Sequence, residues 1–260
     1  IYATGEIVAD SALAEDSSDY VTPATIRKAV RKALDDPLVR AIVVRVDSPG
    51  GSASASDEIW SILKDADRKK PVSVSMGHLA ASGGYYISCA GRRIMADPAT
   101  ITGSIGVVGG KIVLRDTLDW VGLNIEPISG GRHADMLSAL RPFNDEERAY
   151  FKKTLEDIYA VFTSRVAASR GDKVARLDEV AEGRLFTGIQ AKAVGLVDEV
   201  GTLNDAIKIA ARGAGIADNF QIMILPEAKS LSDILREGFF ADLKAPIAIG
   251  GVPSDAIGSL

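Results

Sequence analysis

One serine lies in a stretch whose small residues suit nucleophilic chemistry. Ser82 stands in the run Ala80–Gly84 (AASGG), between an apolar segment and a segment of helical character. Small neighbours let the backbone turn sharply and let a substrate approach the hydroxyl, and a helix beginning there favours a developing oxyanion. The N–H of Gly83 is a candidate donor to that oxyanion. A close helix–strand contact that requires glycines explains the run equally well, so this segment alone leaves both interpretations open.

Two further clusters of glycine and serine could serve the same chemistry. Asp47–Gly51 (DSPGG) follows an apolar run. The backbone N–H groups of Gly50 and Gly51 could face a carbonyl oxygen or align an extended peptide. Thr102–Gly106 (TGSIG) places Ser104 at the start of another apolar run. Each of these two clusters, taken alone, is more typical of an ordinary turn.

A serine nucleophile requires a base, and neither histidine is well placed to act as one. His78 lies four residues before Ser82 on an expected extended segment, about 13 Å away at roughly 3.3 Å per residue. His133 lies on a glycine-rich loop with only Asp135 nearby to orient it. We therefore expect no Ser-His-Asp triad. A lysine kept neutral by burial is the other option, and Lys111 is one candidate.

Composition argues against several other kinds of site. The net charge of −5 disfavours nucleic-acid binding, which needs a basic surface. A single cysteine, Cys89, excludes an internal disulfide framework and a Cys-rich zinc site. No paired histidines with metal-ligand spacing and no phosphate-binding or dinucleotide motif occur in the sequence. We expect neither a metal nor a cofactor. No apolar run approaches the roughly 18 residues of a membrane span.

The three clusters lie between alternating strand and helix patterns. Strands are expected at Arg40–Val46, Val72–Met76, Arg93–Ala96, Ile105–Val108, Leu123–Ile128 and Leu196–Val200. Helices are expected from Thr22-Pro23, over Ile59–Ala66, Ser82–Ala90, Thr187–Val194 and Leu203–Arg212, and from Asn144 to Gly171. Glu147 follows Asn144 at the capping-box spacing, which marks the start of the longest helix. This alternation predicts an α/β layer structure.

Taken together, the clusters resemble in order and spacing the signal peptide peptidase A (protease IV) family of serine peptidases, within the Clp-protease/crotonase superfamily. The matching stretches are AIVVRVDSPGGSASAS, PVSVSMGHLAASGGYYIS, ADPATITGSIGVVGG and FTGIQAKAVGLVDEVG, within about Ile1 to Gly213. The resemblance implies a Clp-protease/crotonase-like stack of ββα units with C-terminal helical elements. Residues 1–215 would form the peptidase domain, and residues 216–260 an extension or oligomerisation arm.

The resemblance also implies a role for each cluster. Ser82 matches the family nucleophile, and Ser104 matches the serine that hydrogen-bonds a catalytic lysine. Gly83, with the Gly50-Gly51 pair, matches the backbone that binds the oxyanion and aligns the substrate.

Two further segments match backbone that flanks the substrate. The resemblance implies that Met76-Gly77 and Ile105 lie beside the substrate as extended strands. They would form pockets that prefer small or apolar side chains.

One position departs from the family pattern. In short members the base is a lysine on the loop that corresponds to Gly130–Asp135, where this chain reads GGRHAD and has Ala134. In long members with two tandem halves, the C-terminal half carries the serine and the N-terminal half supplies the lysine. This chain would then be such a C-terminal half, or else a short member without its lysine. The stretch RHADMLSALRPF and the abrupt start at Ile1 favour the tandem half.

The resemblance therefore implies a serine endopeptidase with a Ser-Lys dyad that degrades remnant signal peptides and other membrane-released peptides. The lysine would come from an N-terminal half or a neighbouring subunit of a homo-oligomer. The expected location is the bacterial inner membrane, on its periplasmic (extracytoplasmic) side, with no anchor in this chain. Two other classes stay open: a non-catalytic scaffold or peptide-binding half, and a crotonase-like acyl-thioester enzyme, against which the serine of AASGG argues.

Overall fold

The computed structural model describes residues 1–15, 17, 19–216 and 220–226. The chain divides into one compact unit, Ile1–Ile224, and a second, Leu225–Leu260. The expected arm at residues 216–260 falls largely outside the described residues, so the domain boundary at residue 215 stays a prediction.

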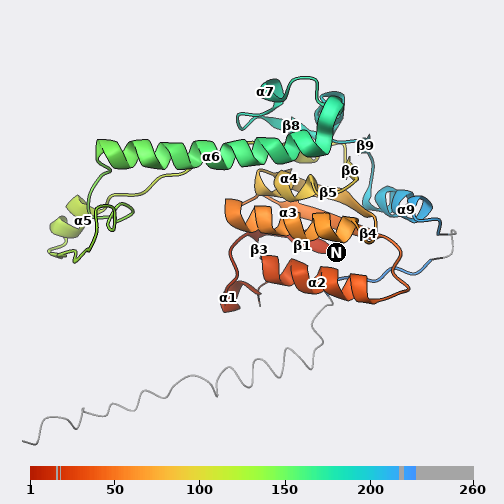
Figure 1. Ribbon diagram of the computed structural model, residues 1–260, viewed down its shortest axis with the longest axis horizontal. Helices are drawn as coiled ribbons and strands as arrows, with labels where there is room; N and C mark the ends of the chain where they lie inside the picture. Colours follow the sequence, from red (N-terminus) through yellow and green to blue (C-terminus); the bar gives the residue numbers. More distant parts are fainter. Residues whose placement is uncertain (16, 18, 217–219, 227–260) are drawn as a thin grey trace, which may run out of the picture. The chain divides into compact units, whose positions relative to one another are not determined.

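A mostly parallel sheet forms the centre of the first unit (Figure 1). Its main path runs β1 (Tyr2–Thr4), β4 (Ile42–Ser48), β5 (Val72–Ala81), β6 (Arg93–Ala96) and β9 (Glu199–Val200), each parallel to its neighbours. Two strands lie off this path: β7 (Ile101–Gly103) pairs parallel with β5, and β8 (Leu185–Thr187) pairs antiparallel with β7. A separate parallel pair consists of β2 (Glu6–Ile7) and β3 (Tyr20–Val21). The α/β prediction is confirmed.

Helices pack around this sheet. In the described residues they are α1 (Ala12–Glu15), α2 (Pro23–Asp35), α3 (Ala53–Asp67), α4 (Gly83–Ser88), α5 (Arg115–Trp120), α6 (Asp145–Arg170), α7 (Leu177–Val180), α8 (Gly188–Ala193) and α9 (Leu203–Gly213), with a 3₁₀ turn at Gly171–Lys173. Helix α3 packs between α2 and α4, and α9 contacts β4 and β5. The core between them is aliphatic, and Val44, Ile59 and Leu63 are fully buried.

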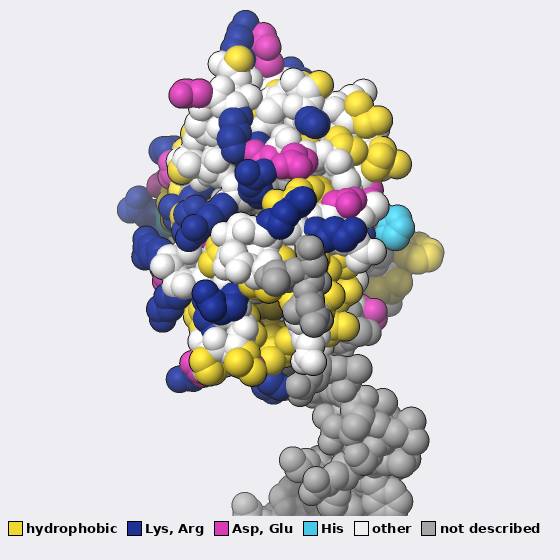
Figure 2. Space-filling model, turned by 90° about the vertical axis from the view of Figure 1, so that its right-hand side faces the viewer, with side chains coloured by type: hydrophobic (Ala, Val, Ile, Leu, Met, Phe, Trp, Pro, Cys, Tyr) yellow, Lys and Arg dark blue, Asp and Glu magenta, His cyan; other side chains and the backbone are white. Residues whose placement is uncertain are grey.

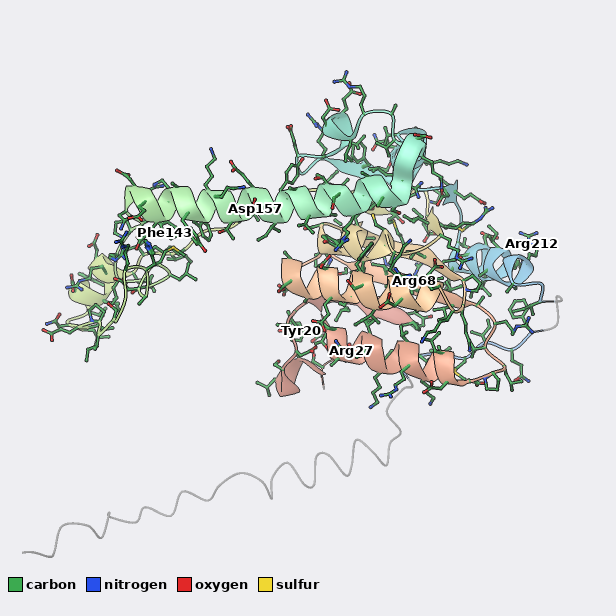
Figure 3. All side chains as sticks on the ribbon, viewed as in Figure 1. Tyr20, Arg27, Arg68, Phe143, Asp157 and Arg212 are labelled. Atoms are coloured by element: carbon green, nitrogen blue, oxygen red, sulfur yellow. The ribbon has the colours of Figure 1, made fainter. Side chains whose placement is uncertain are left out.

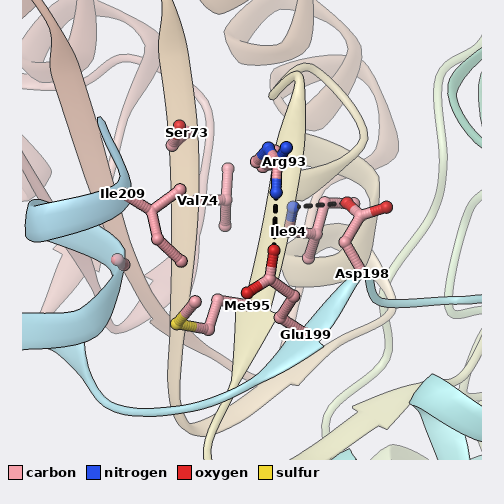
Figure 4. A pocket seen from close by; sticks show the side chains of 9 residues that line it. Ser73, Val74, Arg93, Ile94, Met95, Asp198, Glu199 and Ile209 are labelled. Atoms are coloured by element: carbon pink, nitrogen blue, oxygen red, sulfur yellow. Dashed lines mark hydrogen bonds and ion pairs between the residues drawn. The ribbon is translucent and has the colours of Figure 1, made fainter. Parts of the chain in front are cut away.

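A small hollow lies where α9 meets the edge of the sheet (Figure 4). Arg93 pairs with Glu199 at 2.6 Å, and the carboxylate of Asp198 accepts the Ile94 N–H at 2.8 Å. Its cavity volume of about 10 Å³ admits at most one water molecule. These polar contacts join β6 to the segment that leads into α9, so the hollow is a packing feature of the sheet edge.

Basic side chains gather on the side of the first unit where α9 and the C-terminal end of α3 lie (Figure 2). Arg68 follows α3, and Arg212 lies in the last turn of α9 (Figure 3). Helix C-termini carry partial negative charge that favours such cations. Arg68 and Arg212 therefore lie where the helix ends favour positive charge.

Strand β5 changes its partner halfway along. Its first half pairs with β6 and its last three residues pair with β7, and the register against β4 shifts between these halves. The carboxylate of Asp47 accepts the N–H groups of His78 and Leu79 at this irregularity. A Cβ at Gly77 would lie 2.4 Å from that carboxylate, so only glycine fits there. The second half of β5 then runs directly into Ser82.

Helix α6 extends well beyond the sheet (Figure 1). It starts with a reciprocal capping box in which Asn144 accepts the Glu147 N–H and Glu147 accepts the Asn144 N–H, as the sequence predicted. Near its other end Phe162 packs on Tyr86 of α4, with ring centroids 4.6 Å apart. At about 1.5 Å per residue, its 26 residues span roughly 39 Å.

Residues 107–143, hereafter the distal segment, lie alongside and beyond the N-terminal half of α6 (Figure 1). Phe143, at the end of this segment, lies close to the N-terminus of α6 (Figure 3). The strands expected at Ile105–Val108 and Leu123–Ile128 are wrong. The sheet strand of that region is Ile101–Gly103, and Leu123 and Ile128 are exposed rather than paired in a sheet. Alternating apolar residues therefore indicated strands where the described chain provides no strand partner.

Within the described residues, no helix has both the length and the apolar character required to cross a membrane. The same residues contain no cluster of three or more His, Cys, Asp or Glu side chains arranged for a metal ion.

Candidate active site

Ser82 occupies the junction between β5 and α4 in a strained backbone conformation. Its φ of 51° and ψ of −119° lie in a region that L-residues rarely adopt. It is the N-cap residue of α4, yet its side chain makes no capping hydrogen bond. Its N–H donates to the Gly103 carbonyl at 2.9 Å, which fixes the junction to β7. The sharp strand-to-helix turn that the sequence predicted is confirmed, and it leaves the hydroxyl free of a capping role.

Gly50 packs directly against this junction. With φ of 102°, it has a backbone conformation that favours glycine. A Cβ there would lie 2.6 Å from the Gly83 nitrogen and 2.8 Å from Ser82 Cβ. A Cβ on Gly83 would in turn lie 2.5 Å from Ser56 Oγ. Gly50 is therefore required by close backbone approach at the serine, whereas a side chain on Gly83 would have to displace the Ser56 hydroxyl.

Gly51 presents a second backbone N–H next to the same junction. Ile7 donates its N–H to Gly50 O at 2.8 Å and accepts the Ser52 N–H at 2.7 Å, so the N–H of Gly51 takes no part in this bridge. A Cβ on Gly51 would lie 2.1 Å from the Ile7 carbonyl oxygen. The Gly50 N–H, also predicted for this role, instead donates to Ser48 Oγ at 3.1 Å. The N–H groups of Gly51 and Gly83 therefore remain as the two candidate oxyanion donors.

Ser104 reaches the same site through β7. It follows the strand directly, has a φ of 50°, and donates its N–H to Arg184 O at 2.7 Å. The Gly103 carbonyl accepts the Ser82 N–H, and Ser104 is the next residue along the chain after Gly103. The two serines are therefore connected through a single residue of β7. The third cluster of the sequence is therefore part of the site rather than an independent turn.

The two serines line a cleft with a cavity volume of about 700 Å³, hereafter the Ser82 cleft. Four of its lining residues are serines: Ser52, Ser56, Ser82 and Ser104. Helix α6 contributes an apolar set: Leu155, Ile158, Tyr159 and Phe162. Charged lining residues with largely exposed side chains are Lys152, Glu156 and Glu182. Hydroxyls and backbone amides thus meet an apolar helix face, which suits an extended peptide with apolar side chains.

Three residues expected to flank the substrate do not line the Ser82 cleft. Met76 has a fully buried side chain in β5. The Gly77 carbonyl accepts from Thr100 Oγ1 at 2.6 Å. Ile105 is also fully buried, and its carbonyl accepts the Gly183 N–H at 3.0 Å. Their role beside a substrate stays a prediction.

No base contacts either serine hydroxyl within the described residues. The Lys111 ammonium donates to Met136 O at 2.6 Å and lies 4.3 Å from the centroid of the Phe143 ring, inside the distal segment. Ala134 is exposed in the same segment. Its neighbour His133 lies 3.7 Å from Glu146, at the start of α6.

Part of α6 lies between that loop and the Ser82 cleft. Lys152, the first residue of α6 to line the cleft, follows Glu146 by six residues, a helical rise of about 9 Å. Within the described residues, no hydrogen bond or ion pair joins Lys111 or the Ala134 loop to Ser82.

Lys152 is a lysine of the Ser82 cleft that the sequence reasoning missed. Its Nζ lies 3.7 Å from Glu156, and its side chain is 78% exposed, so it lacks the burial that a proton-accepting lysine needs. Leu155, Ile158 and Phe162 recur at helical spacing and mark the face of α6 that lines the cleft. Only the tertiary contact shows that Lys152 borders the same opening.

A polar cluster fixes α6 against α3 and α4 beside the cleft. The Tyr86 hydroxyl donates to Asp57 at 2.7 Å, and Arg165 Nε donates to the same carboxylate oxygen at 3.1 Å. The Arg165 guanidinium also lies 4.0 Å from the centroid of the Trp60 ring. Burial, together with the Asp57 carboxylate, raises the pKa of Tyr86. Tyr86 stays a neutral donor at ordinary pH, so the cluster persists there.

Comparisons with known proteins identify similar peptidases. The model of peptidase family S49 matches residues 64–217. The chain is 40% identical over 210 residues to the Arabidopsis thaliana protein "Serine protease SPPA, chloroplastic", covering 79% of this chain and 31% of that protein. It is 39% identical over 212 residues to "Protease 4" of Salmonella typhi, covering 81% and 34%. This chain therefore spans about a third of each of those two relatives.

The chain is also similar to a cyanobacterial protein and to a solved structure. A Synechocystis sp. protein with a provisional protease name is 41% identical over 216 residues, covering 82% of this chain and 78% of that protein. Among solved structures, a mutant of ClpP1 from Listeria monocytogenes aligns with a TM-score of 0.48 and 16% identity, covering 79% of this chain and 94% of that chain.

Proposed function

Because the chain belongs to peptidase family S49, we propose that it is the serine-bearing part of a serine endopeptidase, with Ser82 as the nucleophile. One observation carries this proposal: a strained serine shares a cleft with Ser104, next to the N–H groups of Gly51 and Gly83. Strained backbone at a cleft is typical of functional residues. A purely structural turn would need neither the strain nor the second serine.

In the proposed reaction, Ser82 Oγ attacks the carbonyl carbon of the scissile peptide bond while its proton passes to a base. The carbonyl oxygen becomes an oxyanion that accepts hydrogen bonds from the N–H groups of Gly83 and Gly51. When the intermediate collapses, the C–N bond breaks and the base returns the proton to the leaving amine. Water then hydrolyses the acyl ester and restores the Ser82 hydroxyl. Loss of one oxyanion donor typically lowers the rate by about 10²–10³.

The proposed base is a lysine from outside this chain, held by a hydrogen bond to Ser104. It would come from an N-terminal half or from a neighbouring subunit of a homo-oligomer. Two observations support an external source: Ala134 stands at the family's lysine position, and Lys152, which borders the cleft, is exposed. A base supplied in this way would make activity depend on assembly.

The proposed substrates are remnant signal peptides and other membrane-released peptides. The apolar face of α6, with Leu155, Ile158 and Phe162, supports this choice because such peptides carry apolar side chains. A location at the bacterial inner membrane, on its periplasmic (extracytoplasmic) side, is part of the same proposal and rests on the family resemblance.

The test is covalent labelling of the nucleophile. The chain is treated with a serine-reactive phosphonate, alone and with the N-terminal half. Adducts are located by intact mass and peptide mapping. We expect an adduct on Ser82 only when the lysine source is present. Ser82→Ala should abolish it, whereas Ser52→Ala, which removes another hydroxyl of the cleft, should not.

Glycine variants check that the geometry and not only the hydroxyl matters. Gly50→Ala should abolish labelling because a Cβ would lie 2.6 Å from the Gly83 nitrogen. Gly130→Ala is the matched control, since nothing lies within 4 Å of a Cβ there. If no preparation gave a Ser82 adduct, this result would contradict the peptidase proposal and leave a peptide-binding half as the alternative. Tight binding of a coenzyme A thioester would instead favour acyl-thioester chemistry.

A further inference from the structure

Three residues other than glycine have positive φ in the described chain, and all three line the Ser82 cleft. They are Ser82, Ser104 and Glu182, with φ of 51°, 50° and 57°. Such conformations cost free energy and cluster at functional sites. The first two belong to the proposed catalytic machinery. Glu182 belongs to none of the sequence motifs.

Part of the strain at Glu182 has a local cause. The residue follows Ala181, the C-cap of α7, and the position after a C-cap often adopts the left-handed conformation. Glycine or asparagine normally occupies such a position because a larger side chain is strained there. The turn explains the positive φ of Glu182 but not why a carboxylate occupies this position. The side chain therefore requires a separate explanation.

Backbone hydrogen bonds fix the position of Glu182 relative to the nucleophile. Gly183 donates its N–H to Ile105 O at 3.0 Å, and Ser104 donates its N–H to Arg184 O at 2.7 Å. Residues 182–184 therefore run beside residues 104–106. Residues 104–106 directly follow Gly103, whose carbonyl accepts the Ser82 N–H. Three residues span at most about 10 Å, the length that they would have in extended chain. Glu182 thus lies two to three peptide residues away from Ser82.

The carboxylate of Glu182 is available to a ligand. Its side chain is 68% exposed, and the nearest cation, Arg184 Nη2, lies 3.5 Å from Oε2. That separation exceeds the roughly 2.7–2.9 Å of a charge-assisted hydrogen bond. The other terminal nitrogen of Arg184 donates to Asp178 O at 2.9 Å instead. A carboxylate has acceptor capacity for a second cation. The other charged residues that line the cleft, Lys152 and Glu156, lie 3.7 Å from each other on α6.

We propose that Glu182 is a specificity-determining residue that binds a lysine or arginine side chain of the peptide, two to three residues from the scissile bond. The assignment of the scissile bond rests on the proposed function, whereas the binding of the cation does not require catalysis. The Ser82 cleft would then select peptides that combine apolar side chains with one basic residue.

The experiment measures peptide binding without turnover, in the intact protein carrying Ser82→Ala. Fluorescent apolar peptides with lysine at one position are compared with peptides that have norleucine there, and the position is moved along the peptide. We expect the lysine peptide to bind about three- to tenfold more tightly at one or two positions, and this preference to shrink at high salt.

Variants of Glu182 distinguish the effect of its charge on peptide binding from the effect of its backbone conformation. Glu182→Asn keeps a residue that tolerates the left-handed conformation and should abolish the lysine preference, leaving the norleucine peptide unaffected. Glu182→Asp keeps the charge and should retain the preference. Glu156→Gln removes another carboxylate that lines the cleft, one paired with Lys152 on the same helix, and should retain it as well.

Three results would overturn the inference: no binding of either peptide, equal binding of both, or a loss in Glu182→Asn that is the same for both. The last result would assign Glu182 to the turn alone. Peptide hydrolysis by the protein with Ser82 intact is measured separately. A lysine preference without hydrolysis would remove the proposed function and keep this inference, and hydrolysis without preference would do the reverse.

Discussion

The distal segment and the rest of the first unit, hereafter the body, are held together by different interactions. In the body, Val44, Ile59 and Leu63 are fully buried between the sheet and its helices. In the distal segment, large apolar side chains face solvent: Val108, Ile112, Trp120, Leu123, Ile128 and Leu137. Helix α5 buries no residue at all. Hydrophobic burial therefore stabilises the body and contributes little to the distal segment.

Polar contacts hold the distal segment instead. The Arg141 guanidinium binds Asp135 at 2.7 Å and Glu147 at 2.5 Å, and Glu147 is completely buried. Lys111 adds a hydrogen bond to Met136 O. Such contacts fix a shape without covering apolar surface, and exposed apolar surface of this extent is typical of interfaces. The difference supports the proposal that this chain works in an assembly.

The largest contrast is expected from truncating one leucine in each region. Leu63→Ala should lower the free energy of unfolding by about 2–5 kcal/mol, because it leaves a cavity in a fully buried site. Leu137→Ala should change it by less than about 0.5 kcal/mol, because Leu137 is 64% exposed. Urea denaturation of the isolated chain measures both. Equal losses would mean that the distal segment shares the core.

Removing one arginine in each region should give the next largest difference. Arg170 has a side chain only 1% exposed and pairs with Asp198 at 3.0 Å. Arg170→Met leaves that carboxylate buried without this partner and should cost about 3 kcal/mol in global stability. Arg141→Met also leaves a buried carboxylate, Glu147, without this partner, but at the N-terminal end of α6 beside the distal segment. We therefore expect its cost to appear as increased hydrogen exchange over residues 130–147, with the global midpoint nearly unchanged. A fall in the global midpoint for Arg141→Met would contradict this separation.

Helix caps provide a smaller and closely matched pair. Thr22 caps α2 in the body, and Asn144 caps α6 beside the distal segment, each through a reciprocal capping box. Replacing either with alanine should cost its helix about 1 kcal/mol. We expect Thr22→Ala to lower the thermal midpoint of the whole unit and Asn144→Ala to fray the first turns of α6. Hydrogen exchange resolved by segment distinguishes the two outcomes.

Acid should produce an effect that is absent at neutral pH. A hydrogen bond from Arg141 lowers the pKa of Glu147 to about 2. Burial raises the pKa of Asp198, but hydrogen bonds from Arg170 and Lys173 outweigh it and lower the pKa to about 2. Both values lie below the unfolded value near 4. Each carboxylate therefore stabilises the native state fully above about pH 4 and loses this contribution as pH falls toward 2.

The two regions should respond to acid differently. The distal segment should lose exchange protection within this pH window while the body keeps its aliphatic core. Hydrogen exchange measured at stepwise lower pH tests this, with pH 6 as the reference. Uniform loss of protection across both regions would show that the aliphatic core does not compensate for the loss of body carboxylates such as Asp198 in this range.

The sequence patterns predicted the body well because its elements are locally encoded. The capping box at Asn144 and the apolar periodicity that follows it define α6 within one residue of the structure. The apolar run at Arg40–Val46 matches β4, shifted by two residues at each end. The turn at Ser82 also lies where the small residues predicted it. In each case neighbouring residues carry the information.

The same patterns failed where the outcome depends on distant partners. Leu123–Ile128 has strand-like residues, yet it lies in the distal segment, where these side chains are exposed. Strand β8, at Leu185–Thr187, was not expected because its short sequence carries no signal and its pairing with β7 bridges more than 80 positions. Lys152 and Glu182 became candidates only because α6 and the turn after α7 border the Ser82 cleft.

By itself, the sequence determined the α/β class, the glycines and serines of the three clusters, and the absence of a lysine at position 134. These follow from residue types and local spacing, which the chain carries wherever it folds. Only the tertiary structure decided that Ser82 and Ser104 share one cleft and that Lys111 lies in the distal segment. The physical reason is that the cleft forms where β5 exchanges β6 for β7 and α6 packs across α4, and long-range contacts create both arrangements.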